Sequence, residues 1–147
     1  MIREQAQEMS IRFDSYPENE QFARMTIMAF LVDLNPTVDE LEDVKTAVSE
    51  AVTNAIIHGY EKEVGQVLLT CTKIGARVCI TVTDHGKGIA DVKKAREPFF
   101  TTRPDAERSG MGFAFMEAFM DEVHIESQQG RGTRVVMQKK LHLLQKV

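Results

Sequence analysis

The chain has 147 residues, of which 27% are charged and 43% hydrophobic, and its formal net charge is -4. This length is typical of one domain with a substantial core, so we expect residues 1–147 to form a single domain. The interspersed charges and net negative balance disfavour nonspecific nucleic-acid binding, which requires a basic face. We find no apolar run long enough to span a bilayer and no apolar signal core, so we expect a cytoplasmic protein.

The first elements in chain order are a strand and a helix. Apolar and polar residues alternate over residues 9–13, which predicts a strand with one buried face. Residues 15–18 have the form Ser-x-x-Glu with a proline inside, a pattern typical of a helix start. The helix is expected to run to about Leu34, before Asn35 and Pro36 stop it.

This first helix has more apolar residues than one buried face requires. The predicted core stripe has four residues: Phe22, Met25, Ala29 and Val32. Further apolar residues leave little of its second half polar: Ile27, Met28, Phe30, Leu31 and Leu34. A helix that is apolar on more than one side is either deeply buried or covered by another chain. The sequence leaves both alternatives open.

A long central helix is predicted over residues 37–59. Thr37 and Glu40 form a capping box, in which each side chain accepts a hydrogen bond from the backbone N–H of the other residue. Its apolar stripe follows helical spacing: Leu41, Val44, Val48, Ala51, Val52 and Ala55. Gly59 stands where a helix often ends in the left-handed conformation.

Glu50 and Asn54 are four residues apart on this helix and are therefore neighbours on a face that points away from the stripe. They are either part of a solvated surface or a carboxylate–amide pair that holds a metal ion and polarises a hydroxyl. Ala47 and Ile57 lie on the same side and are poor choices for a face that meets only water. Their presence favours a functional pair.

The second half of the chain mixes strands and helices. The expected elements are strands over 66–72 and 77–83 joined by a hairpin at Gly75, a short helix over 91–96, a helix over 112–120, and strands near 123–125 and 133–139. Because strands and helices do not alternate regularly, we expect an α+β fold. It would be a two-layer sandwich of a mixed, largely antiparallel sheet with helices on one face.

The two cysteines of the chain, Cys71 and Cys79, fall on the two strands of the predicted hairpin. If the hairpin forms, they lie near each other on paired strands. They lack the spacing and the partners of a zinc site. We interpret them as reduced core residues.

Asp84, Gly86 and Gly88 form an Asp-x-Gly-x-Gly motif directly after a predicted strand. A buried carboxylate at a strand end can accept a hydrogen bond from an amine, and two close glycines let a flat ring approach the backbone. Taken alone, the motif is also compatible with a plain turn.

A second glycine motif, residues 108–112, stands directly before a predicted helix. Its backbone N–H groups and the helix N-terminus point where an anion would sit. Ser109 adds a hydroxyl, and Arg108 can pair with phosphate oxygens. The alternative is a flexible glycine connection. The motif is neither a Walker loop nor a dinucleotide fingerprint.

The order of these motifs resembles one superfamily of ATPases and kinases, which includes gyrase, histidine kinases and the mismatch-repair ATPases. The motifs in order are Glu-x-x-x-Asn (50–54), Asp-x-Gly-x-Gly (84–88), Gly-x-Gly at a helix start (110–112) and Gly-Thr on a strand (132–133). Segments 49–60, 100–104 and 107–113 resemble more closely the family of bacterial anti-sigma F factors, serine protein kinases of sporulation. The resemblance covers about residues 9–137.

The resemblance implies a role for each matching residue. Asn54 would ligate magnesium, and Glu50 would be the base that takes a proton from the attacking serine. Asp84 would recognise the adenine amine of ATP or ADP, assisted by Thr133. Two glycines would give the adenine ring room: Gly86 and Gly88. Two threonines would belong to the nucleotide lid: Thr101 and Thr102. Five residues would wrap the phosphates: Arg108, Ser109, Gly110, Met111 and Gly112.

The resemblance also implies partners. The chain would be a homodimer that holds sigma factor F and phosphorylates a serine of an anti-anti-sigma protein, which stops that protein from displacing the sigma factor. Glu20, Arg24 and Thr53 match positions that the family uses for partner contacts. The alternatives are a non-catalytic ATP-dependent sigma-binding module, the related general-stress anti-sigma kinase, and a histidine-kinase catalytic domain separated from its receptor.

Overall fold

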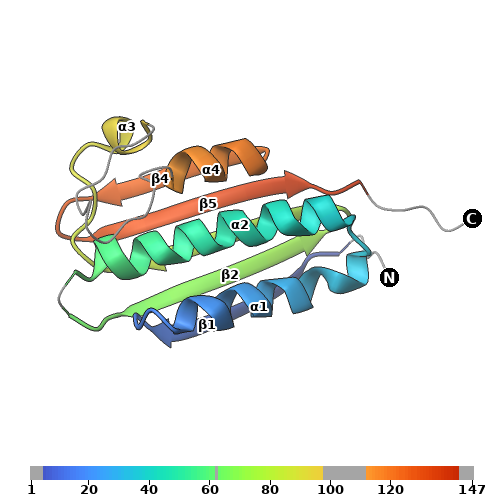
Figure 1. Ribbon diagram of the computed structural model, residues 1–147, viewed down its shortest axis with the longest axis horizontal. Helices are drawn as coiled ribbons and strands as arrows, with labels where there is room; N and C mark the ends of the chain where they lie inside the picture. The colour runs from blue at the N-terminus through green and yellow to red at the C-terminus, as the bar shows by residue number, and fades with distance from the viewer. Residues whose placement is uncertain (1–4, 62, 98–111, 143–147) are drawn as a thin grey trace, which may run out of the picture.

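The molecule has two layers, a five-stranded sheet and a set of helices that cover one of its faces (Figure 1). The structure is a computed structural model and describes residues 5–61, 63–97 and 112–142. The strand order is β1-β2-β3-β5-β4, and each pairing between these strands is antiparallel. The predicted α+β sandwich is confirmed, with an antiparallel sheet where the sequence had allowed for a mixed one.

The elements have the following bounds. The strands are β1 (Gln7–Asp14), β2 (Gln66–Ile74), β3 (Arg77–Asp84), β4 (Glu122–Gln128) and β5 (Gly132–Lys140). The α-helices are α1 (Asn19–Leu31), α2 (Val38–Asn54), α3 (Val92–Ala95) and α4 (Gly112–Phe119). A 3-10 turn η1 (Val32–Leu34) extends α1, and a π-helical turn η2 (Ala55–Gly59) extends α2. Among the described helices, none has the length and apolar character needed to cross a membrane.

Helix α1 begins later than the sequence predicted, and without the expected cap. The residue before its first turn is Glu18, whose side chain makes no capping hydrogen bond. The hydroxyl of Ser15 instead accepts a hydrogen bond from the N–H of Gly65, at 2.9 Å. The Ser15 N–H donates to the Gly65 carbonyl, also at 2.9 Å. The predicted start at residue 15 is therefore wrong, because Ser15 ties the end of β1 to the loop before β2.

The predicted core face of α1 is also wrong. The residues that pack on the sheet are Ala23, Ile27 and Leu31, followed by Leu34 of η1. The four residues expected in the core face solvent, and three of them are more than half exposed: Phe22 at 56%, Met25 at 57% and Val32 at 63%. Helical periodicity could not choose between two apolar stripes on one helix. The choice leaves an apolar stripe on the surface of α1.

Helix α2 begins at the predicted capping box and carries the centre of the core. The hydroxyl of Thr37 accepts from the N–H of Glu40, and the carboxylate of Glu40 accepts from the N–H of Thr37, each at 3.1 Å. Most of the predicted stripe is buried: Val44, Val48, Ala51, Val52 and Ala55. Gly59 does not adopt the left-handed conformation expected of it, because α2 continues into the π-helical turn η2.

The two cysteines lie on paired strands, as predicted, but on opposite faces of the sheet. Cys71 pairs with Ile80, and Thr72 pairs with Cys79. Cys71 is fully buried under the helices, and burial raises the pKa of its thiol to about 12. Cys79 alternates with the buried residues of β3 and therefore faces the other way. The two thiols are free, and their orientation excludes a disulfide between them.

Glu40 joins the start of α2 to the chain that leaves β5. Its carboxylate accepts hydrogen bonds from the N–H of Thr37 and from the N–H of His142, the latter at 2.6 Å. Burial opposes ionisation of the Glu40 carboxyl, but the hydrogen bonds from His142 and Thr37 outweigh burial and lower its pKa.

Glu40→Gln should therefore destabilise the fold by about 1 kcal/mol at pH 7. A lowered pKa means that the ionised carboxylate stabilises the fold above the ordinary glutamate pKa, and that this contribution is lost as the pH falls toward the lowered value. Thermal unfolding of wild type and variant between pH 3 and 7 measures the difference. Glu42→Gln, at an exposed ion pair with Lys45, is the control. A Glu40→Gln effect that does not shrink in acid would contradict the assignment.

Candidate functional site

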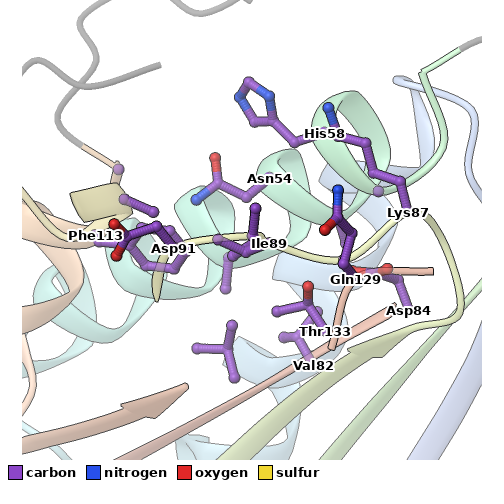
Figure 2. A pocket seen from close by; sticks show the side chains of 18 of the residues that line it. Asn54, His58, Val82, Asp84, Lys87, Ile89, Asp91, Phe113, Gln129 and Thr133 are labelled. Carbon is purple, nitrogen blue, oxygen red and sulfur yellow. The ribbon is translucent and has the colours of Figure 1, made fainter. Parts of the chain in front are cut away.

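A cavity of about 580 Å³ lies between the C-terminal half of α2, the inner face of β3 and β5, and the loop that follows β3 (Figure 2). This volume is within the range of small-molecule sites. Its apolar lining includes Ala51, Ala55, Val82, Ile89 and Val135. Its polar lining comes from separate segments: Asn54, His58, Asp84, Lys87, Asp91, Gln129 and Thr133. An apolar cleft with a few convergent polar groups is typical of a ligand site.

Asp84 ends β3 on the inner face of the sheet and is only 4% exposed. Burial raises the pKa of its carboxyl, and the backbone N–H groups of Gly86 and Thr133 oppose this shift. The Gly86 N–H donates to Asp84 Oδ1 at 2.9 Å. Thr133 lies directly opposite Asp84 on β5, and both line the cavity. This end of the cavity therefore presents a buried carboxylate beside a hydroxyl.

The glycine turn after Asp84 is packed against the end of η2. A Cβ placed on Gly86 would lie 1.9 Å from the carbonyl oxygen of Gly59, and one placed on Gly59 would lie 2.8 Å from the Asp84 carboxylate. The N–H of Lys87 donates to that Gly59 carbonyl at 3.0 Å. Of the two glycines expected to give a ring room, Gly88 lines the cavity, whereas Gly86 makes room for Gly59.

Tyr60 fixes this contact from the side. Its hydroxyl accepts from the N–H of His85 at 2.6 Å and donates to the carbonyl of Gln66 at 2.8 Å. Lys87 forms an ion pair with Glu61 close by. The side chain of Tyr60 thus connects the end of η2, the start of β2 and the turn after β3. These contacts fix the distance between the two walls of the cavity, η2 and the turn after β3.

Glu50 and Asn54 meet the start of α4. A Cβ placed on Gly112 would lie 2.9 Å from Asn54 Nδ2 and 3.4 Å from Glu50 Oε2. Helix α4 packs on α2, and Ala47 on this side of α2 is buried. Glu50 and Asn54 are themselves half-buried, so this face is partly covered by α4 and is not simply solvated. The first turn of an α-helix generally has backbone N–H groups without partners in the helix, and its dipole favours an anion at that end.

The remaining predicted residues divide into two groups. Six fall outside the described residues: Thr101, Thr102, Arg108, Ser109, Gly110 and Met111. The three predicted partner residues do not line the cavity: Glu20, Arg24 and Thr53. Glu20 and Arg24 lie together on α1, with Arg24 Nε 3.7 Å from Glu20 Oε1. Thr53 is half-buried on α2 beside Asn54 in the chain.

Several cavity residues were missed from the sequence. His58 lies four residues after Asn54, and this spacing was a usable signal that the two share a helix face. Lys87 stands between the two glycines of the turn. Gln129 reaches the cavity from the turn between β4 and β5, and no sequence pattern pointed to it (Figure 2).

Solved structures with the same fold include the RsbU and RsbW domains of a Mycobacterium tuberculosis protein, with a TM-score of 0.68 and 22% identity over 92% of this chain and 32% of that longer one. The catalytic domain of the histidine kinase ThkA matches with a TM-score of 0.56 and 16% identity, over 90% of this chain and 96% of that one. The family model described as the histidine kinase-like ATPase domain matches residues 13–139. The fold, the site and this match together define the chain as a histidine kinase-like ATPase domain.

Relatives named anti-sigma F factor match nearly the whole chain. One from Clostridium botulinum (strain Eklund 17B / Type B) is 54% identical over 92% of this chain and 96% of its own length. One from Anoxybacillus flavithermus is 54% identical over 91% of this chain and 92% of its own length. The chain belongs to the anti-sigma F factor family. A Clostridium acetobutylicum member is 50% identical over 93% of this chain and 96% of its own length.

The raised pKa of Asp84 predicts a stability cost for its ionised form. A carboxyl whose folded pKa exceeds the unfolded value binds its proton more tightly in the fold, so stability rises as the pH falls through the folded pKa. Asp84→Asn should raise the melting temperature at pH 7 by a few degrees. That gain should vanish in acid. Thermal unfolding from pH 4 to 8 measures this gain, and Asp14→Asn, a substitution at an exposed position, is the control. A melting temperature of Asp84→Asn below that of wild type at pH 7 would contradict the predicted stability cost.

Proposed function

We propose that this chain is an ATP-dependent serine protein kinase that also holds sigma factor F and so acts as an anti-sigma factor. The observation that carries the proposal is the convergence of Glu50 and Asn54 on the start of α4, next to a cavity that contains Asp84 and Thr133. The phosphate acceptor would be a serine of an anti-anti-sigma protein. Membership of the anti-sigma F factor family supports this pairing of kinase and binding roles.

The cavity suits an adenine nucleotide in shape and chemistry. Asp84 and Thr133 would receive the adenine amine, over the apolar floor formed by Val82 and Val135. The phosphates would extend toward Asn54 and the start of α4, where the dipole of a helix N-terminus favours anions. Gly112 has no side chain there, which lets the start of α4 approach Asn54 and Glu50 closely.

Asn54 is the residue that would hold magnesium, because its amide oxygen is a hard ligand. Among the described residues, no group of three or more His, Cys, Asp or Glu gathers at a metal position, so phosphate oxygens would complete the coordination with Asn54. Bound magnesium would neutralise charge that develops on the transferred phosphoryl group. Glu50, one turn earlier on α2, would take the proton of the attacking serine hydroxyl.

A homodimer is the second part of the proposal. The exposed stripe of α1, which continues into η1, has the heptad-like spacing i, i+3, i+7, i+10: Phe22, Met25, Ala29 and Val32. Helix α1 lies at one side of the helical layer, where a second copy can reach it (Figure 1). Beside the stripe, Glu20 Oε1 and Arg24 Nε are shielded from solvent without a hydrogen-bond partner among the described residues. These two atoms lie 3.7 Å from each other, and a bound sigma factor, not the second copy of the chain, would supply the missing hydrogen bonds.

Glu50→Gln should reduce phosphate transfer to an anti-anti-sigma protein by ~100-fold or more and leave ATP affinity nearly unchanged. Asn54→Ala is the matched variant and should abolish magnesium-dependent ATP binding. Labelled ATP measures transfer, and calorimetry measures affinity. If the wild-type chain holds sigma factor F but transfers no phosphate, it is a non-catalytic binding module and the kinase assignment is wrong.

Met25→Glu should convert the dimer to a monomer, because it places a charge in the α1 stripe at a position that is 57% exposed and so tolerates it in the folded monomer. Sedimentation velocity measures the change. A Met25→Glu variant that remains dimeric would show that the dimer interface does not lie on α1.

Arg24→Ala should preserve the dimer and weaken sigma-factor binding about tenfold at unchanged ATP affinity.

A further inference from the structure

We propose that Ser127 is a positioning residue that fixes the hydroxyl of Thr133 as a hydrogen-bond acceptor and thereby makes the cavity prefer a purine with an exocyclic amine. The inference rests on the proposed nucleotide site. Ser127 lies on β4 and is not one of the described residues that line the cavity. It would therefore act through Thr133.

Ser127, Thr133 and Asp84 stand in one row across three strands. Ser127 is paired with Thr133 between β4 and β5, and Thr133 is paired with Asp84 between β5 and β3. Directly opposed residues of antiparallel strands point to the same face of the sheet. Figure 2 shows Thr133 and Asp84 at the floor of the cavity. Ser127 is the next side chain in that row, one strand further out.

The hydrogen bonds of Ser127 settle which hydroxyl donates. Its Oγ lies 3.0 Å from the carbonyl oxygen of Gly132, which can only accept, so the single hydroxyl hydrogen of Ser127 is used there. The N–H of Ile89 donates to the same Oγ at 2.7 Å. The third contact, 2.9 Å to Thr133 Oγ1, must then be donated by Thr133. One donor and two acceptor sites are the full capacity of a serine hydroxyl.

The hydrogen of Thr133 therefore points at Ser127 and away from the cavity. Toward the cavity, Thr133 offers a lone pair beside the carboxylate of Asp84, so two acceptors stand next to each other. The two N–H groups of an exocyclic amine match two acceptors. A carbonyl oxygen in the same place would face them without a hydrogen bond and lose affinity.

Ser127 also ties the segment after Gly88 to β4 through Ile89, so its removal has a structural effect that the experiment must separate. The probes are ATP and inosine triphosphate, which carries an oxygen in place of the amine. Affinities are measured by calorimetry for wild type, Ser127→Ala, Ser127→Thr, Thr133→Val and the double variant Ser127→Ala/Thr133→Val.

Wild type should prefer ATP. Ser127→Ala frees the Thr133 hydroxyl to turn and donate, so the ratio of ATP to inosine triphosphate affinity should narrow about five- to tenfold. Ser127→Thr keeps a hydroxyl and should keep the wild-type ratio. With Thr133→Val in place, Ser127→Ala should no longer change the ratio, because the residue it acts through is gone.

Equal weakening of both nucleotides by Ser127→Ala would mean that Ser127 only anchors Ile89, which overturns the inference and leaves the nucleotide site intact. If Ser127→Ala also narrows the ratio of ATP to inosine triphosphate affinity when Thr133→Val is present, the inference is overturned as well. Wild-type chain that binds neither nucleotide would refute the proposed function itself, and with it the inference.

Discussion

The contact on which the site depends is the packing of the end of η2 against the glycine turn after β3. A Cβ on Gly86 would overlap the carbonyl of Gly59, a Cβ on Gly59 would press on the Asp84 carboxylate, and Tyr60 fastens the contact by two hydrogen bonds. This contact sets the C-terminal end of α2 above the end of β3. Asn54 and Asp84, thirty residues apart in the chain, thereby line one cavity. A side chain at either glycine would push the two walls apart.

The two ends of the cavity differ in chemistry. At one end, a buried carboxylate and the hydroxyl of Thr133 stand over an apolar floor, which suits a flat ring that donates hydrogen bonds. At the other end, Asn54 and Glu50 meet the first turn of α4, where backbone N–H groups favour an anion. A ligand that satisfies both ends has a flat donor-bearing ring and an anionic tail. Burial of Asp84 raises its pKa, so the fold sustains a carboxylate that it would hold more easily as the acid.

Local patterns in the sequence predicted local structure well and failed where tertiary packing decides. The capping box at Thr37 involves residues three apart and forms as expected. The face of α1 was predicted wrongly, because both stripes of that helix are apolar and only the sheet selects one. Gly59 was expected as a left-handed helix end, yet its role is the approach to Asp84, a contact across the fold. Ser127 had no sequence signal, since its place beside Thr133 depends on the register of β4 against β5.

A crystal structure of the chain with magnesium and a nonhydrolysable ATP analogue tests most directly whether a single nucleotide joins the two ends of this cavity. We expect the adenine amine within hydrogen-bonding distance of Asp84, the phosphates at the start of α4, and the metal ion on the amide oxygen of Asn54. A nucleotide bound elsewhere, or one whose phosphates point away from Asn54 and Gly112, would contradict the proposed site and the kinase function built on it.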